Sequence, residues 1–156
     1  MGANINIGRV RGQYCKELTR EQTEELAIAA FRELADYAAP KNVQIALETV
    51  TIMQTNFINT CAEGADMVDR VNRPNFRLML DVFHLNLEEK DLFEAIRRYS
   101  SYNIHVHLAA AIQASADWIL KKSFLPSENA DMMVHLPRKY SSCQAWKARQ
   151  RVRLSI

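Results

Sequence analysis

The segment Phe76-Arg77-Leu78-Met79-Leu80-Asp81-Val82-Phe83-His84 decides the fold class of this chain. Its apolar run Phe76–Leu80 lies between Pro74 and Asp81, which is typical of a short buried strand that ends in a carboxylate. Helical patterns flank this strand, one between Thr60 and Pro74 and the other over Leu87–Tyr99. A strand placed between two helices predicts parallel neighbours, because the crossover helices return the chain to the same edge of the sheet.

The same alternation of strands and helices extends in both directions from this segment. We predict further strands over Ala3–Ile7, Val43–Leu47 and Ile104–Leu108, and a helix that Thr19 and Gln22 cap and that ends at Pro40. A βαβαβαβ order favours either a doubly wound sheet or a (β/α)₈ barrel. Four strands cannot close an eight-stranded barrel, which takes about 250 residues.

Composition excludes several other classes of protein. The 156 residues are 48% hydrophobic and 24% charged, which is ordinary for one globular domain. We find no apolar stretch long enough to span a membrane and no signal-peptide pattern. The cysteines at 15, 61 and 143 are odd in number and widely spaced, so neither a disulfide framework nor a zinc clip is indicated. These features predict a cytoplasmic protein.

Polar side chains stand where three of the predicted strands end. Glu48 follows the second strand, Asp81 and His84 follow the third, and His105 and His107 share one face of the fourth. The carboxyl ends of parallel strands meet at one edge, so these groups predict a divalent-metal shell with mixed oxygen and nitrogen ligands. Each acid could instead be a helix cap or a loop charge, and the pair of histidines could serve a substrate as well as a metal.

Four segments resemble one family in order and spacing: Asn4–Gly12, Glu48–Thr60, Asp81–Glu89 (the pattern D-x-F-H-x-N-x-E-E) and His105–Ala109. Residues 3–109 are similar to the xylose-isomerase-like TIM-barrel sugar isomerases and epimerases, in particular to members of the D-tagatose 3-epimerase and 5-keto-L-gluconate epimerase type. The resemblance implies an α/β fold, a partial (β/α)₈ TIM barrel that holds strands four to seven of the family, followed by an irregular or helical tail. We therefore expect a domain over 1–109 and a non-family tail over 110–156.

The resemblance also assigns roles to the polar groups. It implies that Glu48, Asp81 and His107 bind the metal and that Glu48 is also a catalytic carboxylate. It implies that His84 contacts the substrate, and we assign His105 to the substrate as well. Gln54 stands where the family has an acid that contacts substrate, so the identity of the sugar is open.

The implied reaction is proton transfer beside the carbonyl of a ketose or keto-sugar acid. The implied metal is Mn²⁺, with Mg²⁺, Co²⁺ or Zn²⁺ as alternatives, and it would polarise the substrate oxygens. Family members carry a further metal-binding and catalytic Glu on an eighth strand, for which residues 110–156 offer no match. This difference leaves open whether the chain is active.

The last 47 residues differ in charge and pattern from the rest. Residues 110–156 carry eight basic and three acidic side chains, against 12 and 15 in residues 1–109. When the tail is read one nucleotide out of frame, the codons of Met132, Met133 and Val134 must give Asp-Gly, and Trp118 with Ile119 must give Asp. Permitted codons elsewhere give a family-like helix and turn. We hypothesise that the gene lost its frame near Ala109.

Other functions fit the same residues less well. A non-catalytic remnant that binds metal is the main alternative, and a lyase or dehydratase could use the same barrel. A DNA-repair endonuclease would use the basic tail on phosphates, but its trinuclear cluster needs more histidines than 84, 105 and 107, which argues against a nucleic-acid partner. Open sheet edges would favour a homo-oligomer.

Overall fold

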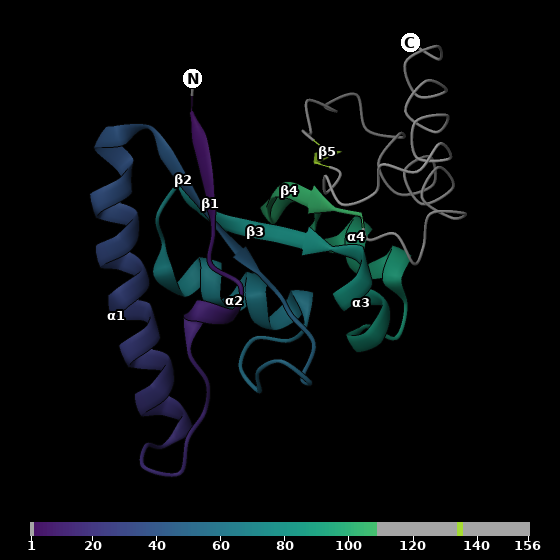
Figure 1. Cartoon of the computed structure of the whole chain (residues 1–156), viewed down its shortest axis with the longest axis horizontal. Helices are drawn as coiled ribbons and strands as arrows, with labels where there is room; N and C mark the ends of the chain where they lie inside the picture. The colour runs from purple at the N-terminus through teal and green to yellow at the C-terminus, as the bar shows by residue number, and fades with distance from the viewer. Residues whose placement is uncertain (1, 109–133, 136–156) are drawn as a thin grey trace, which may run out of the picture.

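The computed structural model describes residues 2–108 and 134–135, and within them the chain forms one parallel sheet with helices packed on it (Figure 1). The sheet has the order β1-β2-β3-β4-β5, so each strand pairs with its neighbour in the sequence. Its strands are β1 (Ala3–Asn6), β2 (Val43–Glu48), β3 (Phe76–Asp81), β4 (Asn103–His107) and β5 (Val134–His135). This order, with helical crossovers between the first four strands, is that of a partial TIM barrel and confirms the predicted fold class.

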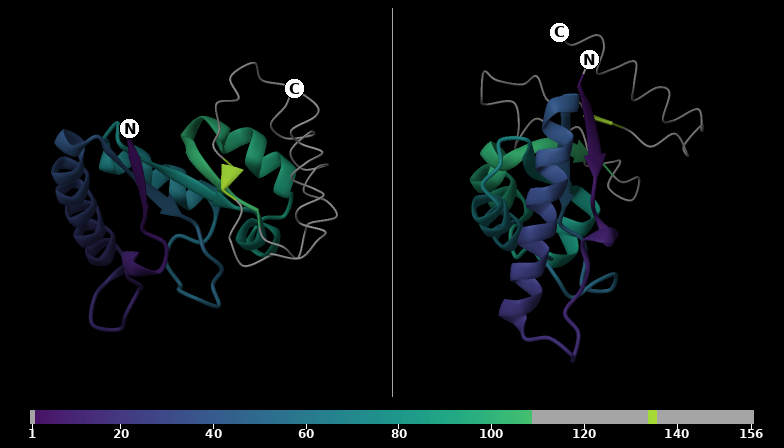
Figure 2. Two further views of the ribbon diagram at one scale, coloured as in Figure 1. Left: turned by 45° about the horizontal axis from the view of Figure 1, so that its top comes forward. Right: turned by 90° about the vertical axis from the view of Figure 1, so that its left-hand side faces the viewer.

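The strands β2 and β3 form the centre of the sheet. Ile45 pairs with Phe76 and Leu47 with Leu78, and all four side chains are buried. In contrast, the four residues of β1 are exposed, and β1 forms the edge of the described sheet. The strand direction turns steadily from β1 to β4, as expected of a twisted sheet (Figure 2).

Helices α1 (Arg20–Ala38) and α2 (Cys61–Val71) both begin at capping boxes, that of α1 at the predicted residues Thr19 and Gln22 and that of α2 at Thr60 and Glu63. In each helix, the N-cap threonine hydroxyl accepts the N–H of the residue three positions on, and that residue's side chain accepts the N–H of the threonine. Asn72 ends α2 in the left-handed region, at φ 52°. The two helices lie side by side in Figure 1, α1 against β2 and α2 against β3.

The predicted helix Leu87–Tyr99 is wrong, because the structure has two helices, α3 (Val82–Glu88) and α4 (Leu92–Tyr99). The first begins directly at the end of β3, where the Asp81 carboxylate accepts the N–H of Phe83. The second begins at Asp91, whose carboxylate accepts the N–H groups of Phe93 and Glu94. Two acidic caps thus start two helices where the apolar periodicity alone suggested one.

Three short 3₁₀ helices complete the described elements, at Arg9–Arg11, Ala39–Lys41 and Ser100–Tyr102. The largest fully buried side chains come from β2, β3, α2, α3, α4 and the loop after β2. Among them, Phe76 stacks on Phe31 of α1, with ring centroids 5.2 Å apart. The core therefore lies between the sheet and its helices, and it leaves the carboxyl ends of the strands free for polar groups.

The strand β5 was not predicted. Its residues Val134 and His135 pair in parallel with Val106 and His107. The remainder of the predicted tail, with the hypothesised loss of frame, lies outside the described residues. Within residues 2–108 and 134–135, no helix is both long and apolar enough to cross a membrane.

Candidate metal-binding site

Glu48 is the last residue of β2 and the only buried acid among the described residues. The preceding residues Ile45, Ala46 and Leu47 are at most 1% exposed, and Glu48 itself is 8% exposed. Its Oε2 accepts a hydrogen bond of 2.8 Å from Asn6 Nδ2, at the end of the neighbouring strand β1. The apolar strand thus places a carboxylate at the carboxyl end of the sheet, where the neighbouring Asn6 amide donates a hydrogen bond to one of its oxygens.

Asp81 ends β3 in the same way and has two roles there. Its Oδ1 accepts the N–H of Phe83 at 2.8 Å, which starts α3, and its Oδ2 lies 3.6 Å from His107 Nδ1. Burial opposes ionisation, but His107 and the Phe83 amide outweigh it and lower the pKa of Asp81 below its usual range. Asp81 therefore stands as a carboxylate beside Glu48.

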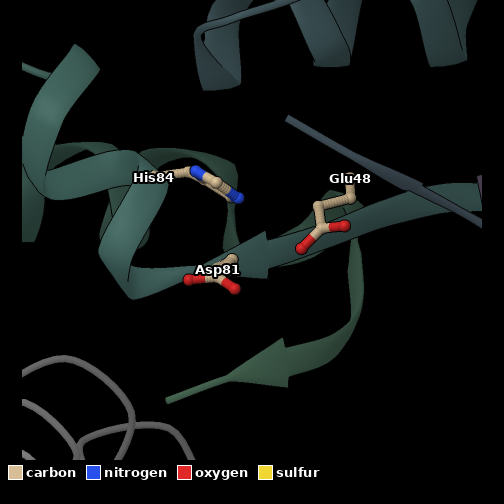
Figure 3. Close-up of side chains that lie close together, drawn as sticks. All are labelled: Glu48, Asp81 and His84. Atoms are coloured by element: carbon tan, nitrogen blue, oxygen red, sulfur yellow. The ribbon is translucent and has the colours of Figure 1, made fainter. Parts of the chain in front are cut away.

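His84 reaches the same place from the first turn of α3. Its Nδ1 accepts the backbone N–H of Thr51 at 3.4 Å, which leaves Nε2 as the second donor or acceptor of the ring. Figure 3 shows the side chains of Glu48, Asp81 and His84 converging, and each of them offers an atom within 4.8 Å of the others. In the sequence, these three residues are up to 36 positions apart.

His107 completes the cluster from β4. Its Nδ1 lies 3.6 Å from Glu48 Oε1 and 3.6 Å from Asp81 Oδ2, and in the sheet it pairs with Asp81. Asp81 first and Glu48 second raise the pKa of His107 to about 9, although partial burial acts against this. At neutral pH, a protonated His107 therefore places one positive charge between the two neighbouring carboxylates.

His105 and Gln54, the other predicted substrate contacts, are placed differently. His105 lies next to His107, with ring centroids 5.2 Å apart and the planes at 80°. Gln54 is exposed in the loop between β2 and α2. The substrate roles of both residues stay predictions.

The loop that carries Gln54 is held at both ends by the consecutive acids Glu88 and Glu89. Glu88 Oε1 accepts the N–H of Ile52 at 2.9 Å, and Glu89 Oε1 accepts the N–H of Cys61 at 2.7 Å. The two acids that close the motif of β3 and α3 therefore tie the neighbouring loop to α3. These two hydrogen bonds give the motif Asp81–Glu89 a structural role, in addition to the place of Asp81 and His84 in the site.

Asn6 and Arg11 also contact the site, although neither was predicted from the sequence to do so. Arg11 is 5% exposed and donates to four backbone carbonyls, those of Gly8, Glu48, Phe57 and Ile58. Burial lowers its pKa to about 10, and the nearby Glu48 acts against this shift. No local signal distinguishes Asn6, because it is a regular polar position of the alternation Asn4-Ile5-Asn6-Ile7, as Asn4 is. Arg11 has no local signal either, because its partners are backbone groups up to 47 residues away.

The cluster fits a divalent cation on the chemistry of its donors. Carboxylate oxygens and imidazole nitrogens are the ligands that Mn²⁺, Zn²⁺ and similar ions accept. Two carboxylates beside each other also need a positive charge, which the proton on His107 supplies in the metal-free chain. A bound divalent ion would replace that proton and supply the larger charge. The described residues thus contain a candidate metal site. Glu48, Asp81 and His84 each offer a ligand atom there, and His107 lies beside the two carboxylates.

Comparison with known proteins finds sugar 3-epimerases among the relatives of this chain. An L-ribulose 3-epimerase of Methylomonas sp. (strain DH-1) is 39% identical over 97 residues, which are 62% of this chain and 34% of that protein. A crystal structure of D-psicose 3-epimerase with D-tagatose, from Clostridium cellulolyticum H10, has a TM-score of 0.61 and 32% identity, and covers 68% of this chain and 38% of that one. A structure of the IOLI protein with a bound zinc atom has a TM-score of 0.57 and 25% identity, over 68% and 37% of the two chains.

This chain thus spans between about a third and two fifths of the length of these relatives. The family model described as "Xylose isomerase-like TIM barrel" matches residues 2–122 and so extends past the predicted boundary at residue 109. The matched region contains all four residues of the cluster, each at the carboxyl end of its strand or directly after it. The chain belongs to the xylose isomerase-like TIM barrel family.

Proposed function

We propose that this chain carries part of the active site of a sugar epimerase that acts on a ketose or keto-sugar acid by metal-assisted proton transfer. The observation that carries the proposal is the position of His107 Nδ1, 3.6 Å from a carboxylate oxygen of both Glu48 and Asp81. The relatives support the substrate class, since they include an L-ribulose 3-epimerase and a D-psicose 3-epimerase. The proposal concerns the activity of the whole protein. The L-ribulose 3-epimerase relative is about three times as long as the region that this chain matches.

Glu48, Asp81 and His107 would hold the metal, and Mn²⁺ is the ion that we propose. Mg²⁺, Co²⁺ and Zn²⁺ remain alternatives for the same donors, and the zinc atom of the IOLI structure shows that a relative accepts one of them. The bound ion would polarise a carbonyl oxygen of the substrate, so that a neighbouring C–H proton becomes acidic. The protein's part is to hold the three side chains close together, and the bound ion would take the place of the proton on His107.

Glu48 is the carboxylate that we assign to proton transfer. It is buried, so it meets the substrate with little competition from water, and its Oε2 is fixed by Asn6. His84, His105 and Gln54 would contact the sugar hydroxyls, with His84 oriented by the backbone N–H of Thr51. Within residues 2–108 the cluster has only the two carboxylates that we assign to the metal, so returning a proton to the opposite face of the carbon needs a further acid.

Metal binding without turnover is the second candidate function. It is favoured by the same count of carboxylates in the described cluster. The cytoplasmic location, self-association through open sheet edges and the domain boundary near residue 109 stay predictions of the sequence.

Calorimetry with Mn²⁺ on the full chain tests the proposal. We expect stoichiometric binding that His107→Ala abolishes, because one of three donors is removed. His105→Ala is the matched control, since it removes an imidazole from the same strand two residues away and should leave metal binding unchanged. Epimerisation of L-ribulose and D-psicose by the metal-loaded chain separates the two candidate functions. Absence of Mn²⁺ binding, or equal loss in both variants, would contradict the assigned site.

A further inference from the structure

The two oxygens of the Glu48 carboxylate have different surroundings. Oε1 lies 3.6 Å from His107 Nδ1, on the side of the proposed metal site. Oε2 accepts a hydrogen bond of 2.8 Å from Asn6 Nδ2, on the side of β1. A carboxylate that is free on both sides can bind a cation through one oxygen or through both, so this asymmetry limits how Glu48 can act.

The turn after β1 is built closely around the same oxygen. A Cβ atom on Gly8 would lie 2.6 Å from Glu48 Oε2, which is closer than atoms of this kind approach each other. Gly8 does not have a positive φ, at −58°, so its lack of a side chain matters here for space. Any other residue at this position would move the carboxylate.

The backbone of Glu48 is fixed by a third residue of the same segment. Arg11 donates from Nη1 to the carbonyl oxygens of both Gly8 and Glu48, which ties the turn to the end of β2. The segment from Asn6 to Arg11 therefore contacts Glu48 at its carboxylate through Asn6 and Gly8, and at its backbone through Arg11. None of these contacts involves Oε1.

We infer that Asn6 and Gly8 are positioning residues, which hold Glu48 Oε2 so that only Oε1 is presented to the bound cation. This inference rests on the proposed metal site and adds to it the coordination mode of one ligand. A carboxylate that binds through one oxygen leaves room in the coordination shell for two substrate oxygens, which a ketose supplies from its carbonyl and an adjacent hydroxyl. By holding Glu48 Oε2, Asn6 and Gly8 thus keep coordination positions of the cation open for the substrate.

The test compares Asn6→Asp with the matched control Asn4→Asp in the full chain. Both changes add one negative charge at exposed positions of the same strand face, but only Asn6 donates to Glu48. We expect Asn6→Asp to weaken Mn²⁺ binding by about 10- to 100-fold, since hydrogen-bond partners of metal ligands have effects of this size. We expect Asn4→Asp to change it by less than about threefold, as for a screened surface charge.

The visible absorption spectrum of the Co²⁺-loaded chain provides the second readout, because its bands report the number and geometry of the ligands. We expect Asn6→Asp and Gly8→Ala each to alter these bands, while Asn4→Asp retains those of the unmodified chain. Gly8→Ala keeps the Asn6 amide and moves Oε2 by contact alone, so the two variants test the same oxygen independently. Circular dichroism confirms in each case that the helices are retained.

The outcomes separate this inference from the proposed function. If the unmodified chain binds neither Mn²⁺ nor Co²⁺, the proposed metal site fails, and the inference fails with it. If the unmodified chain binds both ions, and folded Asn6→Asp and Gly8→Ala bind them with unchanged affinity and spectrum, only the positioning role is overturned.

Discussion

Two arginines in different regions of this chain differ in their burial and in the groups to which they donate hydrogen bonds. Arg11, at the carboxyl end of the sheet, is 5% exposed and donates to four backbone carbonyls. Arg73, on the outer side near α1, forms a bidentate pair with Asp36 at 2.6 Å and 3.0 Å, in which Arg73 is partly exposed and Asp36 is exposed. The second contact joins two opposite charges, whereas the first joins a charge to neutral carbonyl groups.

The acids of the two regions differ in the same way. At the carboxyl end, Glu48 and Asp81 lie beside each other and depend on the charge of His107. On the outer face, the Arg73 guanidinium lowers the pKa of Asp36, but water also surrounds that carboxylate. Charges held in a partly buried cluster are screened little, whereas exposed ions are screened by solvent and salt. We therefore expect changes at the carboxyl end to have large effects and changes on the outer face to have small ones.

The largest effect on stability should follow Arg11→Met. The substitution keeps much of the volume but leaves four backbone carbonyls without their donor, at a cost of about 3–5 kcal/mol in the free energy of unfolding. Urea unfolding measures this cost. Arg9→Met in the same 3₁₀ helix is the control, because Arg9 is exposed. Equal stability of the two variants would show that the contacts of Arg11 contribute nothing beyond those of a surface arginine.

The next effect concerns metal affinity. Glu48→Gln retains the shape of the side chain but removes its charge, and we expect Mn²⁺ binding to weaken by at least about 100-fold, because loss of a ligand exceeds the loss of a ligand's partner. Glu24→Gln is the control from the outer face, where Glu24 pairs with Arg70 at 2.6 Å. Calorimetry on both variants gives the comparison, and similar affinities would place the metal elsewhere.

The pH dependence of stability should show a smaller effect from His107. Folding raises its pKa from the usual 6.5 to about 9. The stabilisation by protonated His107 is therefore complete below about pH 6.5 and is lost as pH rises through about 9. Allowing for solvent screening, we expect a loss of about 1 kcal/mol in the metal-free chain.

The contribution of protonated His107 is isolated by urea unfolding of the unmodified chain and of His107→Gln. Both are measured in the presence of a chelator, at pH 6 and at pH 9.5. The difference between the unmodified chain and the variant should shrink at the higher pH. A difference that is the same at both values would mean that His107 is not protonated in the folded state.

The smallest effect should follow Arg73→Ala on the outer face. Because Arg73 is partly exposed and Asp36 is exposed, solvent screens the pair, and we expect the urea midpoint to change by no more than the error of the measurement, at low and at high salt. A clear loss of stability that disappears at high salt would show that this face contributes more than its exposure indicates.

Much of the fold could be predicted, because its signals are local. The capping boxes at Thr19 and Thr60, and the apolar runs that end at Glu48 and Asp81, each depend on residues within one turn or one strand. The split of the third helix could not be read from periodicity. It depends on Asp91 starting a new helix while Glu89, in an extended conformation, bonds to Cys61 on another element.

The sequence by itself determined that two carboxylates and two histidines stand where parallel strands end. Parallel strands with helical crossovers place these ends at one edge whatever the side chains are. Only the tertiary structure decided which atoms face each other, for example that Glu48 turns Oε1 to His107 and Oε2 to Asn6. The physical reason is distance along the chain: Asn6 and Glu48 are 42 residues apart, and their contact depends on strand register and side-chain rotamer, which no local pattern encodes.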